Sequence, residues 1–372
     1  MRTSLRLTIG FCLAAAALSS YGRHYIAPER VGLAPEVTFA SERWNGVPFT
    51  GSSIPSIKAM IKVQVAEPPA EDSACPRKVA LWLGNSQLHS INDQKPGDHL
   101  APYWLRKASQ CPNEFVPLGI SLPNSDLQEY LVLAHYVTAR LPISQLIICL
   151  TFDKLREDSL RNEFADLISD EDRKQMRTDA LARSIVERAE AEWHTSSSGS
   201  GGGGPLEGFV QKHVEDGLNA VLSRESRMWA QRANLQNALL FDLYFARNDL
   251  LGIQPNTVRK MIPLRYQRNM AALRSLLDNM RAARIPVLAY IAPVRQIPAP
   301  PYDPVEYEAW KRVVAGLAQE TGIRLMNLEK LVPDDQWGSY HGDDVDFMHF
   351  RGKGHQLLAE AINAELVSAE RR

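Results

Sequence analysis

Short apolar runs separated by amphipathic segments recur along most of the chain. Each run spans five to seven residues, which is too short for a buried helix but suits a strand of a parallel sheet covered on both faces. We therefore predict five strands, at residues 78–83, 115–119, 145–150, 285–291 and 323–328.

The segments between these runs repeat apolar residues every three or four positions, as amphipathic helices do. Asp303-Pro304 and Gly322 are typical of the start and the end of one of these helices. Strands that alternate with helices predict an α/β fold, a doubly wound parallel sheet of the flavodoxin-like three-layer type. The predicted helices lie at about residues 126–137, 265–284, 303–321 and 354–369.

The same pattern divides the chain into unequal parts. Residues 1–22 are predicted to be a signal peptide or an N-terminal anchor, and 23–76 an irregular spacer without clear periodicity. Residues 77–372 form the α/β domain, interrupted by a charged helical insertion at about 157–237 that contains a Gly/Ser linker at 196–204. The insertion has two interpretations: a solvated helical flap, or a lid or docking arm for a membrane partner.

The first residues have the layout of a secretory signal. Arg2 and Arg6 precede an apolar run from Leu7 to Leu18, and small residues follow at Ala17 and Ser19. The run is short for a membrane span, which needs roughly 20 apolar residues. We expect an exported protein that is periplasmic or lies on the extracytoplasmic face of the inner membrane, and both a cleaved signal and a retained anchor remain open.

Composition narrows the classes of partner. With 372 residues, 45% of them hydrophobic, the chain can form an ample core. Lys and Arg number 42 against 43 Asp and Glu, so no polyanion-binding excess exists and nucleic acid is not an expected partner.

The four cysteines indicate neither a metal site nor a settled disulfide. Cys12 lies in the signal, and Cys149 lies in an apolar run where it is expected to be a small buried hydrophobe. Cys75 and Cys111 are able to pair in an oxidising compartment, but the spacing does not decide this. No metal ion and no cofactor is predicted.

Ser86 is the candidate nucleophile. It follows the first apolar run directly, after Gly84-Asn85, and so stands at the carboxyl end of a central strand, where open α/β sheets bind their ligands. A serine at such a place is more often a turn residue or a helix cap, and it needs a base to become a nucleophile.

The candidate base is His349, with Asp346 as the group that orients it. Both are predicted to lie in a loop between the last strand and the last helix, which also opens at the carboxyl edge of the sheet. His89 is a rival base, although on a helix after Ser86 it is expected to point away. His355 is interpreted as a packing or capping residue of the last helix, and His341 and Asp343 receive no role.

With these motifs in view, the chain resembles the SGNH (GDSL-like) hydrolase superfamily. Gly84-Asn85-Ser86 after the first strand and Asp346-x-x-His349 before the last helix are similar to the first and last sequence blocks of that family, and Gly354-His355 follows its usual ending. The resemblance implies a Ser86–His349–Asp346 triad that forms an acyl-enzyme. It covers the sheet but not the insertion.

The resemblance also implies an oxyanion site, at which this chain departs from the family pattern. Gly119 lies near the glycine that follows the second strand in the family, and Asp153 stands where the family has an asparagine. An ionised aspartate cannot donate a hydrogen bond. Asn248 is a substitute donor by sequence alone, and backbone N–H groups at Ser86 and after Gly119 are further candidates.

A signal or anchor, a spacer and an SGNH-like domain together resemble the branch of the family that acylates extracellular polymers. This implies an exported serine-dependent O-acyltransferase, with an acetyl or similar group, a glycan acceptor, and an acyl donor such as a membrane-embedded acyltransferase. An esterase with the same triad is the alternative enzyme. A non-catalytic assembly factor of a polysaccharide secretion complex is the alternative from another class, motivated by Asp153 and by the long insertion.

Overall fold

The computed structural model describes one compact unit of the chain, which spans residues 36–197 and 255–372. The predicted signal, the three cysteines other than Cys149, Asn248, His341 and Asp343, and most of the Gly/Ser linker lie outside the described residues. The described residues are 37–39, 42–66, 78–109, 115–158, 160–197, 257–340 and 344–370.

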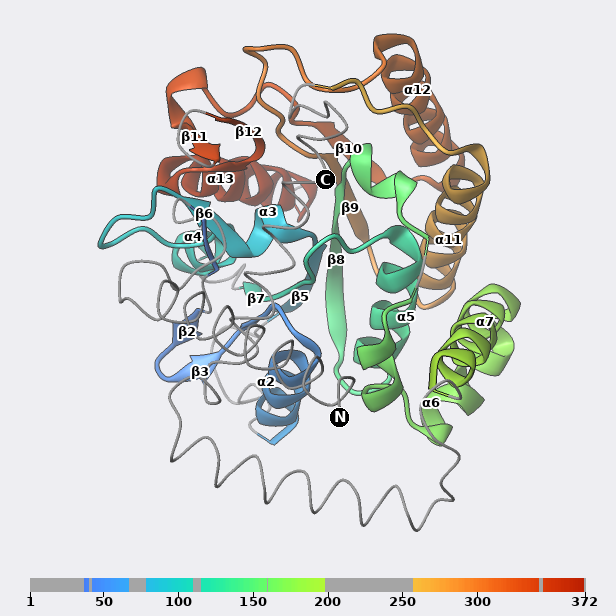
Figure 1. Cartoon of the computed structure of the whole chain (residues 1–372). Helices are drawn as coiled ribbons and strands as arrows, with labels where there is room; N and C mark the ends of the chain where they lie inside the picture. Colours follow the sequence, from blue (N-terminus) through green and yellow to red (C-terminus); the bar gives the residue numbers. More distant parts are fainter. Residues whose placement is uncertain are drawn as a thin grey trace, which may run out of the picture. The chain divides into compact units, whose positions relative to one another are not determined.

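A six-stranded sheet forms the centre of this unit (Figure 1). Its order is β10-β9-β8-β5-β7-β4, and every neighbouring pair is parallel. The chain leaves β5 for β7 on one side and then returns past β5 to β8 on the other, which confirms the predicted doubly wound α/β fold. The strands are β4 (Thr50–Gly51), β5 (Lys78–Gly84), β7 (Phe115–Ser121), β8 (Ile143–Leu150), β9 (Val287–Ile291) and β10 (Arg324–Asn327).

Helices cover both faces of the sheet because successive crossovers run in opposite directions on either side of β5. Figure 1 shows α4 (Ala101–Ala108) and α13 (Gly352–Glu370) on one side of the strands. It shows α5 (Leu127–Thr138), α11 (Pro263–Ala282) and α12 (Pro304–Thr321) on the other side.

The central strand β5 contributes side chains to the two hydrophobic cores, one on each face of the sheet. Its side chains alternate, so that Ala80 and Trp82 belong to the core under α4 and α13, while Leu81 and Leu83 belong to the core under α5 and α11. The indole Nε1 of the fully buried Trp82 donates a hydrogen bond of 3.1 Å to Tyr290 Oη on β9. The strand is therefore fixed on both faces, and its carboxyl end is held in place for the residues that follow it.

The predicted spacer is wrong for residues 42–66, which belong to the domain. Helix α2 (Ile54–Ala66) buries Ile57 and Met60 completely in the core shared with α5, and β4 extends the sheet beside β7. Strand β4 has only two residues, so it produces no alternation that a sequence pattern could reveal. Three further short strands precede α2: β1 (Val37–Phe39), which pairs with β6 (Ser90–Asn92), and the hairpin of β2 (Arg43–Trp44) and β3 (Val47–Pro48).

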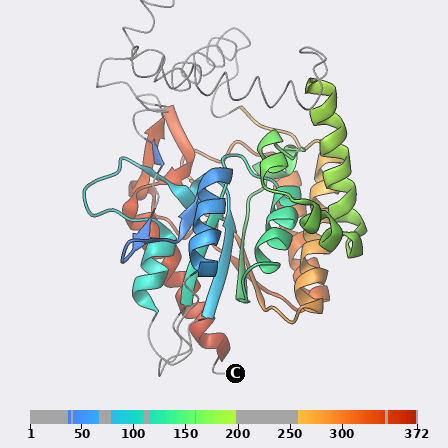
Figure 2. The same ribbon diagram turned by 90° about the horizontal axis from the view of Figure 1, so that it is seen from below.

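The described part of the helical insertion is packed against the domain rather than solvated. Figure 2 shows α7 (Ala180–Ser197) alongside α5 and α11, and Phe164 is fully buried in the same core. The guanidinium of Arg161 binds the buried carboxylate of Glu129 on α5 through Nε at 2.7 Å and Nη2 at 2.9 Å. A flap is therefore the wrong interpretation for residues 160–197, and helix α7 includes the first two residues of the predicted linker.

The remaining elements of the insertion are short. They are η2 (Asn162–Asp166), α6 (Asp170–Gln175) and η3 (Met176–Thr178), preceded by η1 (Asp153–Arg156) directly after β8. Among the helices within the described ranges, none is both long enough and apolar enough to span a bilayer.

Candidate active site

Ser86 is the first residue of a short helix that begins where β5 ends. This helix, α3, spans Ser86–His89, and Asn85 caps it by accepting a hydrogen bond of 3.0 Å from the backbone N–H of Gln87 at its side-chain Oδ1. A Cβ at Gly84 would lie 2.8 Å from Leu88 Cβ, so only glycine allows α3 to fold back so tightly against the strand. The turn places the Ser86 hydroxyl at the carboxyl edge of the sheet.

Asp346 and His349 lie on strand β12 (Asp344–Phe350), which pairs with β11 (Trp337–Tyr340) in a small antiparallel hairpin. The sequence predicted a loop here. The segment nevertheless lies between β10 and α13, as expected, and it reaches the same edge of the sheet as Ser86.

The structure brings the three predicted side chains into one hydrogen-bonded chain. His349 Nε2 lies 3.0 Å from Ser86 Oγ, and His349 Nδ1 lies 2.9 Å from Asp346 Oδ2. An ionised carboxylate only accepts, so Nδ1 carries the proton and Nε2 is left to accept the serine hydroxyl. This is the arrangement in which an imidazole can remove the serine proton.

The Asp346 carboxylate is buried but well supplied with donors. Its Oδ1 accepts the backbone N–H groups of Met348 and His349, each at 2.9 Å. Burial raises the pKa of Asp346, but the His349 ring and these hydrogen bonds outweigh it and leave the pKa below its usual value. Asp346 is therefore ionised at neutral pH.

Gln87 joins the two halves of the site. Its side-chain Nε2 donates to the carbonyl of Met348 at 2.9 Å and to the carbonyl of Pro293, after β9, at 2.8 Å. The residue after Ser86 thus holds the residue before His349. The sequence offered one weak signal for Gln87 and Asn85, namely polar residues directly beside the candidate nucleophile.

The two alternative histidines lie elsewhere. The buried His89 has Nδ1 2.8 Å from Ser121 Oγ at the end of β7, and burial lowers its pKa to about 3. His355 is a packing residue on the buried face of α13, as expected. Its Nε2 donates to the carbonyl of Ser90 on β6 at 3.0 Å, and its Nδ1 accepts the N–H of Ala101 on α4 at 3.3 Å. Neither ring is bonded to Ser86 as that of His349 is.

His355 should make the stability of the domain depend on pH. Burial lowers the pKa of His355 to about 3. Between about pH 6.5 and 3, His355 is therefore protonated in the unfolded chain but neutral in the folded chain. We expect the free energy of unfolding of the parent, relative to a His355→Gln variant, to fall by about 1.4 kcal/mol per pH unit as the pH drops from 6 to 4. Urea titrations at several pH values measure this difference, and a difference independent of pH would contradict a neutral buried ring.

Of the three positions considered for the oxyanion site, Gly119 and Asp153 lie in the described part of the chain. Gly119 lies inside β7, and its N–H donates to the carbonyl of Phe49 at 2.9 Å. Asp153 accepts from Arg259 Nη1 at 2.7 Å, and as a carboxylate it has no proton to donate. Asn248 lies outside the described residues. The strand ends two residues later than the sequence predicted, which explains the misplacement of Gly119.

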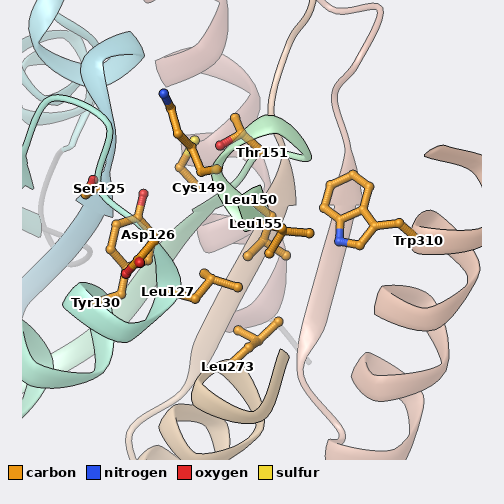
Figure 3. Close-up of a pocket in the computed structure, with 11 residues that line it drawn as sticks. Ser125, Asp126, Leu127, Tyr130, Cys149, Leu150, Thr151, Leu155, Leu273 and Trp310 are labelled. Atoms are coloured by element: carbon orange, nitrogen blue, oxygen red, sulfur yellow. The ribbon is translucent and has the colours of Figure 1, made fainter. Parts of the chain in front are cut away.

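A small cavity lies near the turn that carries Ser86, and none of the three triad residues lines it. Figure 3 shows the residues that do. Two of its lining residues contact that turn: Ser125 Oγ donates to the carbonyl of Gly84 at 3.0 Å, and Thr151 Oγ1 accepts from Asn85 Nδ2 at 2.7 Å. The cavity encloses about 10 Å³, which is room for about one water molecule. Its lining includes Cys149, which is buried as the sequence predicted. Burial raises the pKa of the Cys149 thiol to about 12.

No cluster of three or more His, Cys, Asp or Glu residues suited to a metal ion occurs in the part of the chain that the structure describes.

No protein-family model and no curated relative matches the sequence. Among solved structures, the chain is similar to a GDSL-like lipase from Bacteroides thetaiotaomicron, at 9% identity and a TM-score of 0.38 over 85% of this chain and 100% of that one. It is also similar to an acetylxylan esterase from Geobacillus stearothermophilus, at 12% identity and a TM-score of 0.35 over 78% of this chain and 94% of that one. At these scores the similarity adds no weight to the residues and distances described above.

The resemblance to the SGNH hydrolases thus rests on the chain itself. Gly84-Asn85-Ser86 stands at the end of the central strand β5, and Asp346-x-x-His349 lies between β10 and α13. Their side chains meet at the carboxyl edge of the doubly wound parallel sheet. In its motifs and in its fold, the chain resembles the SGNH (GDSL-like) hydrolases.

Proposed function

We propose that this protein is a serine-dependent enzyme of acyl transfer, with Ser86 as nucleophile, His349 as general base and acid, and Asp346 as the group that orients His349. The observation that carries the proposal is the unbroken chain Ser86 Oγ–His349 Nε2 and His349 Nδ1–Asp346 Oδ2, at 3.0 and 2.9 Å. Three residues of the required types, from two distant segments, have the protonation pattern that the reaction needs.

In the first half-reaction, Ser86 Oγ attacks the carbonyl carbon of an ester donor while His349 Nε2 takes the hydroxyl proton. The bond from that carbon to the leaving oxygen breaks, and His349 returns the proton to the leaving alcohol. The backbone N–H of Ser86 supports the oxyanion, because the first N–H groups of a helix have no acceptor within it. In the second half-reaction an acceptor hydroxyl gives its proton to His349 while its oxygen attacks the acyl carbon. The bond from that carbon to Ser86 Oγ then breaks, and His349 returns the proton to Ser86 Oγ.

We propose a small acyl group such as acetyl, as the resemblance stated above implies. For the acceptor we propose a glycan hydroxyl of the cell envelope or an exported polysaccharide, with a membrane-embedded acyltransferase as donor. This part rests on the layout of residues 1–22 and on the resemblance stated above, as does the extracytoplasmic location. Water as acceptor would make the same site an esterase.

The experiment uses the chain without its first 22 residues and p-nitrophenyl acetate as donor. Mass spectrometry after rapid acid quench should find one acetyl group on the peptide that contains Ser86. Adding a series of oligosaccharides should then divide the acetyl group between sugar and water. Acetylated sugar supports the transferase, acetate alone supports the esterase, and an unlabelled Ser86 would favour the assembly factor.

A further inference from the structure

Asn92 has a fully buried polar side chain next to the Ser86–His349–Asp346 triad. It is the last residue of β6, six residues after Ser86, and none of its surface is exposed. The segment is anchored from two sides, since Val37 on β1 faces Asn92 across an antiparallel pair and His355 holds the carbonyl of Ser90. A buried amide in such a fixed strand has a defined orientation.

That amide points at the third member of the triad. Asn92 Nδ2 donates to Asp346 Oδ2 at 2.9 Å and to the carbonyl of Ser339 on β11 at 2.8 Å. Oδ2 is the same oxygen that faces His349 Nδ1, also at 2.9 Å. One carboxylate oxygen is thus held between an amide N–H and the imidazole N–H, while the other is held by two backbone N–H groups.

The orientation of the amide follows from its neighbours. Turning it over would place Asn92 Oδ1 against an ionised carboxylate, so the donor end must face Asp346. Oδ1 then lies against the backbone of Gly338, where a Cβ would come within 1.8 Å of it. Among the described residues no donor reaches Oδ1, which is buried. This unsatisfied oxygen is an energetic cost of holding the amide with its N–H groups toward Asp346 and Ser339.

We infer that Asn92 is a positioning residue of the triad: its side-chain N–H fixes Asp346 Oδ2 in line with His349 Nδ1. The inference rests on the proposed function. Asn92 contacts neither the nucleophile nor the acyl group, and it acts only through Asp346. Without this donor the carboxylate can rotate away from the imidazole, because the two backbone N–H groups hold only its other oxygen.

The test compares Asn92→Ala with Asn92→Leu. Alanine leaves space, whereas leucine has nearly the shape of asparagine but no donor, so a shared effect reports the lost N–H and not a cavity. We expect kcat for p-nitrophenyl acetate to fall about tenfold or more in both variants, the loss typical of a hydrogen bond to a charged group, with KM unchanged. In the proton NMR spectrum, the far-downfield signal of His349 Nδ1–H should broaden or disappear in both.

Asn269 provides a matched control. It is equally buried, and its Nδ2 likewise donates to backbone carbonyls, including that of Glu157 at 2.8 Å, but it lies on α11. Asn269→Ala and Asn269→Leu should lower stability while kcat and the Nδ1–H signal stay as in the parent. Parent-like kcat and an unchanged signal in both Asn92 variants, or a change confined to KM, would overturn the inference.

The two proposals fail differently. If the parent never forms an acyl-enzyme, the proposed function fails, and the Nδ1–H signal still shows whether Asn92 holds Asp346 against His349. If the parent is active and the signal is indifferent to Asn92, the function stands and the positioning role falls.

Discussion

Replacing Ser86 by alanine should abolish acetylation of the protein and lower the rate of ester cleavage by about 10⁴-fold or more, while leaving the fold intact. The Ser86 hydroxyl is the group that forms the covalent bond. Among the described residues, no other side-chain hydroxyl is hydrogen-bonded to the Nε2 of an imidazole that could take its proton. His349→Ala should have an effect of similar size. Burst and steady-state kinetics with p-nitrophenyl acetate measure both, with circular dichroism to check folding.

The chain contains its own control for this prediction. Ser121 is a buried serine that also lies at the carboxyl edge of the sheet, and its hydroxyl lies 2.8 Å from the Nδ1 of a histidine, His89. Burial lowers the pKa of this imidazole to about 3, so the ring is a poor proton acceptor. Ser121→Ala should retain most of the activity; if Ser121→Ala and not Ser86→Ala removed it, the nucleophile would be misassigned.

Asp346→Asn should lower kcat by about 10⁴-fold with little change in the structure of the site. The asparagine amide is able to donate to His349 Nδ1, which moves the ring proton to Nε2 and makes the ring a donor toward Ser86 instead of an acceptor. The backbone hydrogen bonds to Oδ1 can persist, so the segment should keep its shape, but Asn92 Nδ2 loses Oδ2 as its acceptor and the free energy of unfolding should fall.

Kinetics together with thermal unfolding check this prediction. A variant that unfolds cooperatively well above the assay temperature, with the expected loss of kcat, indicates a tautomer effect. Near-parental kcat would mean that Asp346 does not set the state of His349, and the triad would reduce to a Ser86–His349 pair.

The sheet was predictable because it is built from apolar runs that need no special geometry. Strands β5, β7, β8 and β9 all lie where the runs lie, and so does the turn that carries Ser86. What escaped prediction was short or tertiary in origin. Strand β4 has two residues, and α2 gains its place by packing on β3 and β4.

The site shows the same division. Ser86, His349 and Asp346 could be found because catalysis needs those residue types at the carboxyl edge of the sheet. Had β12 been predicted as a strand, its regular geometry would have argued against the pair, since residues three apart on a strand point to opposite faces. The pairing of β12 with β11 is irregular between Val345 and Phe350, and in this stretch the N–H groups of Met348 and His349 donate to Asp346 Oδ1. The two side chains therefore come together despite their spacing.

Asn92 could not be found from sequence by any of these arguments. Its partners lie about 250 residues further along the chain, and nothing in Ser90-Ile91-Asn92 indicates which oxygen its amide meets. The misplacement of Gly119 has a similar cause, because the length of β7 is set by its pairing with β5 as far as Ser121.

The separation of 263 residues between Ser86 and His349 has a consequence for the order of events during synthesis. The nucleophile, its turn and all six strands of the sheet precede β12 in the chain, so they are synthesised before the base. Only when the hairpin of β11 and β12 docks beside α3 does the serine acquire a partner for its proton. A nascent chain stopped before β12 should therefore have no acyl-transfer activity, and the domain should gain activity only in the last steps of its folding.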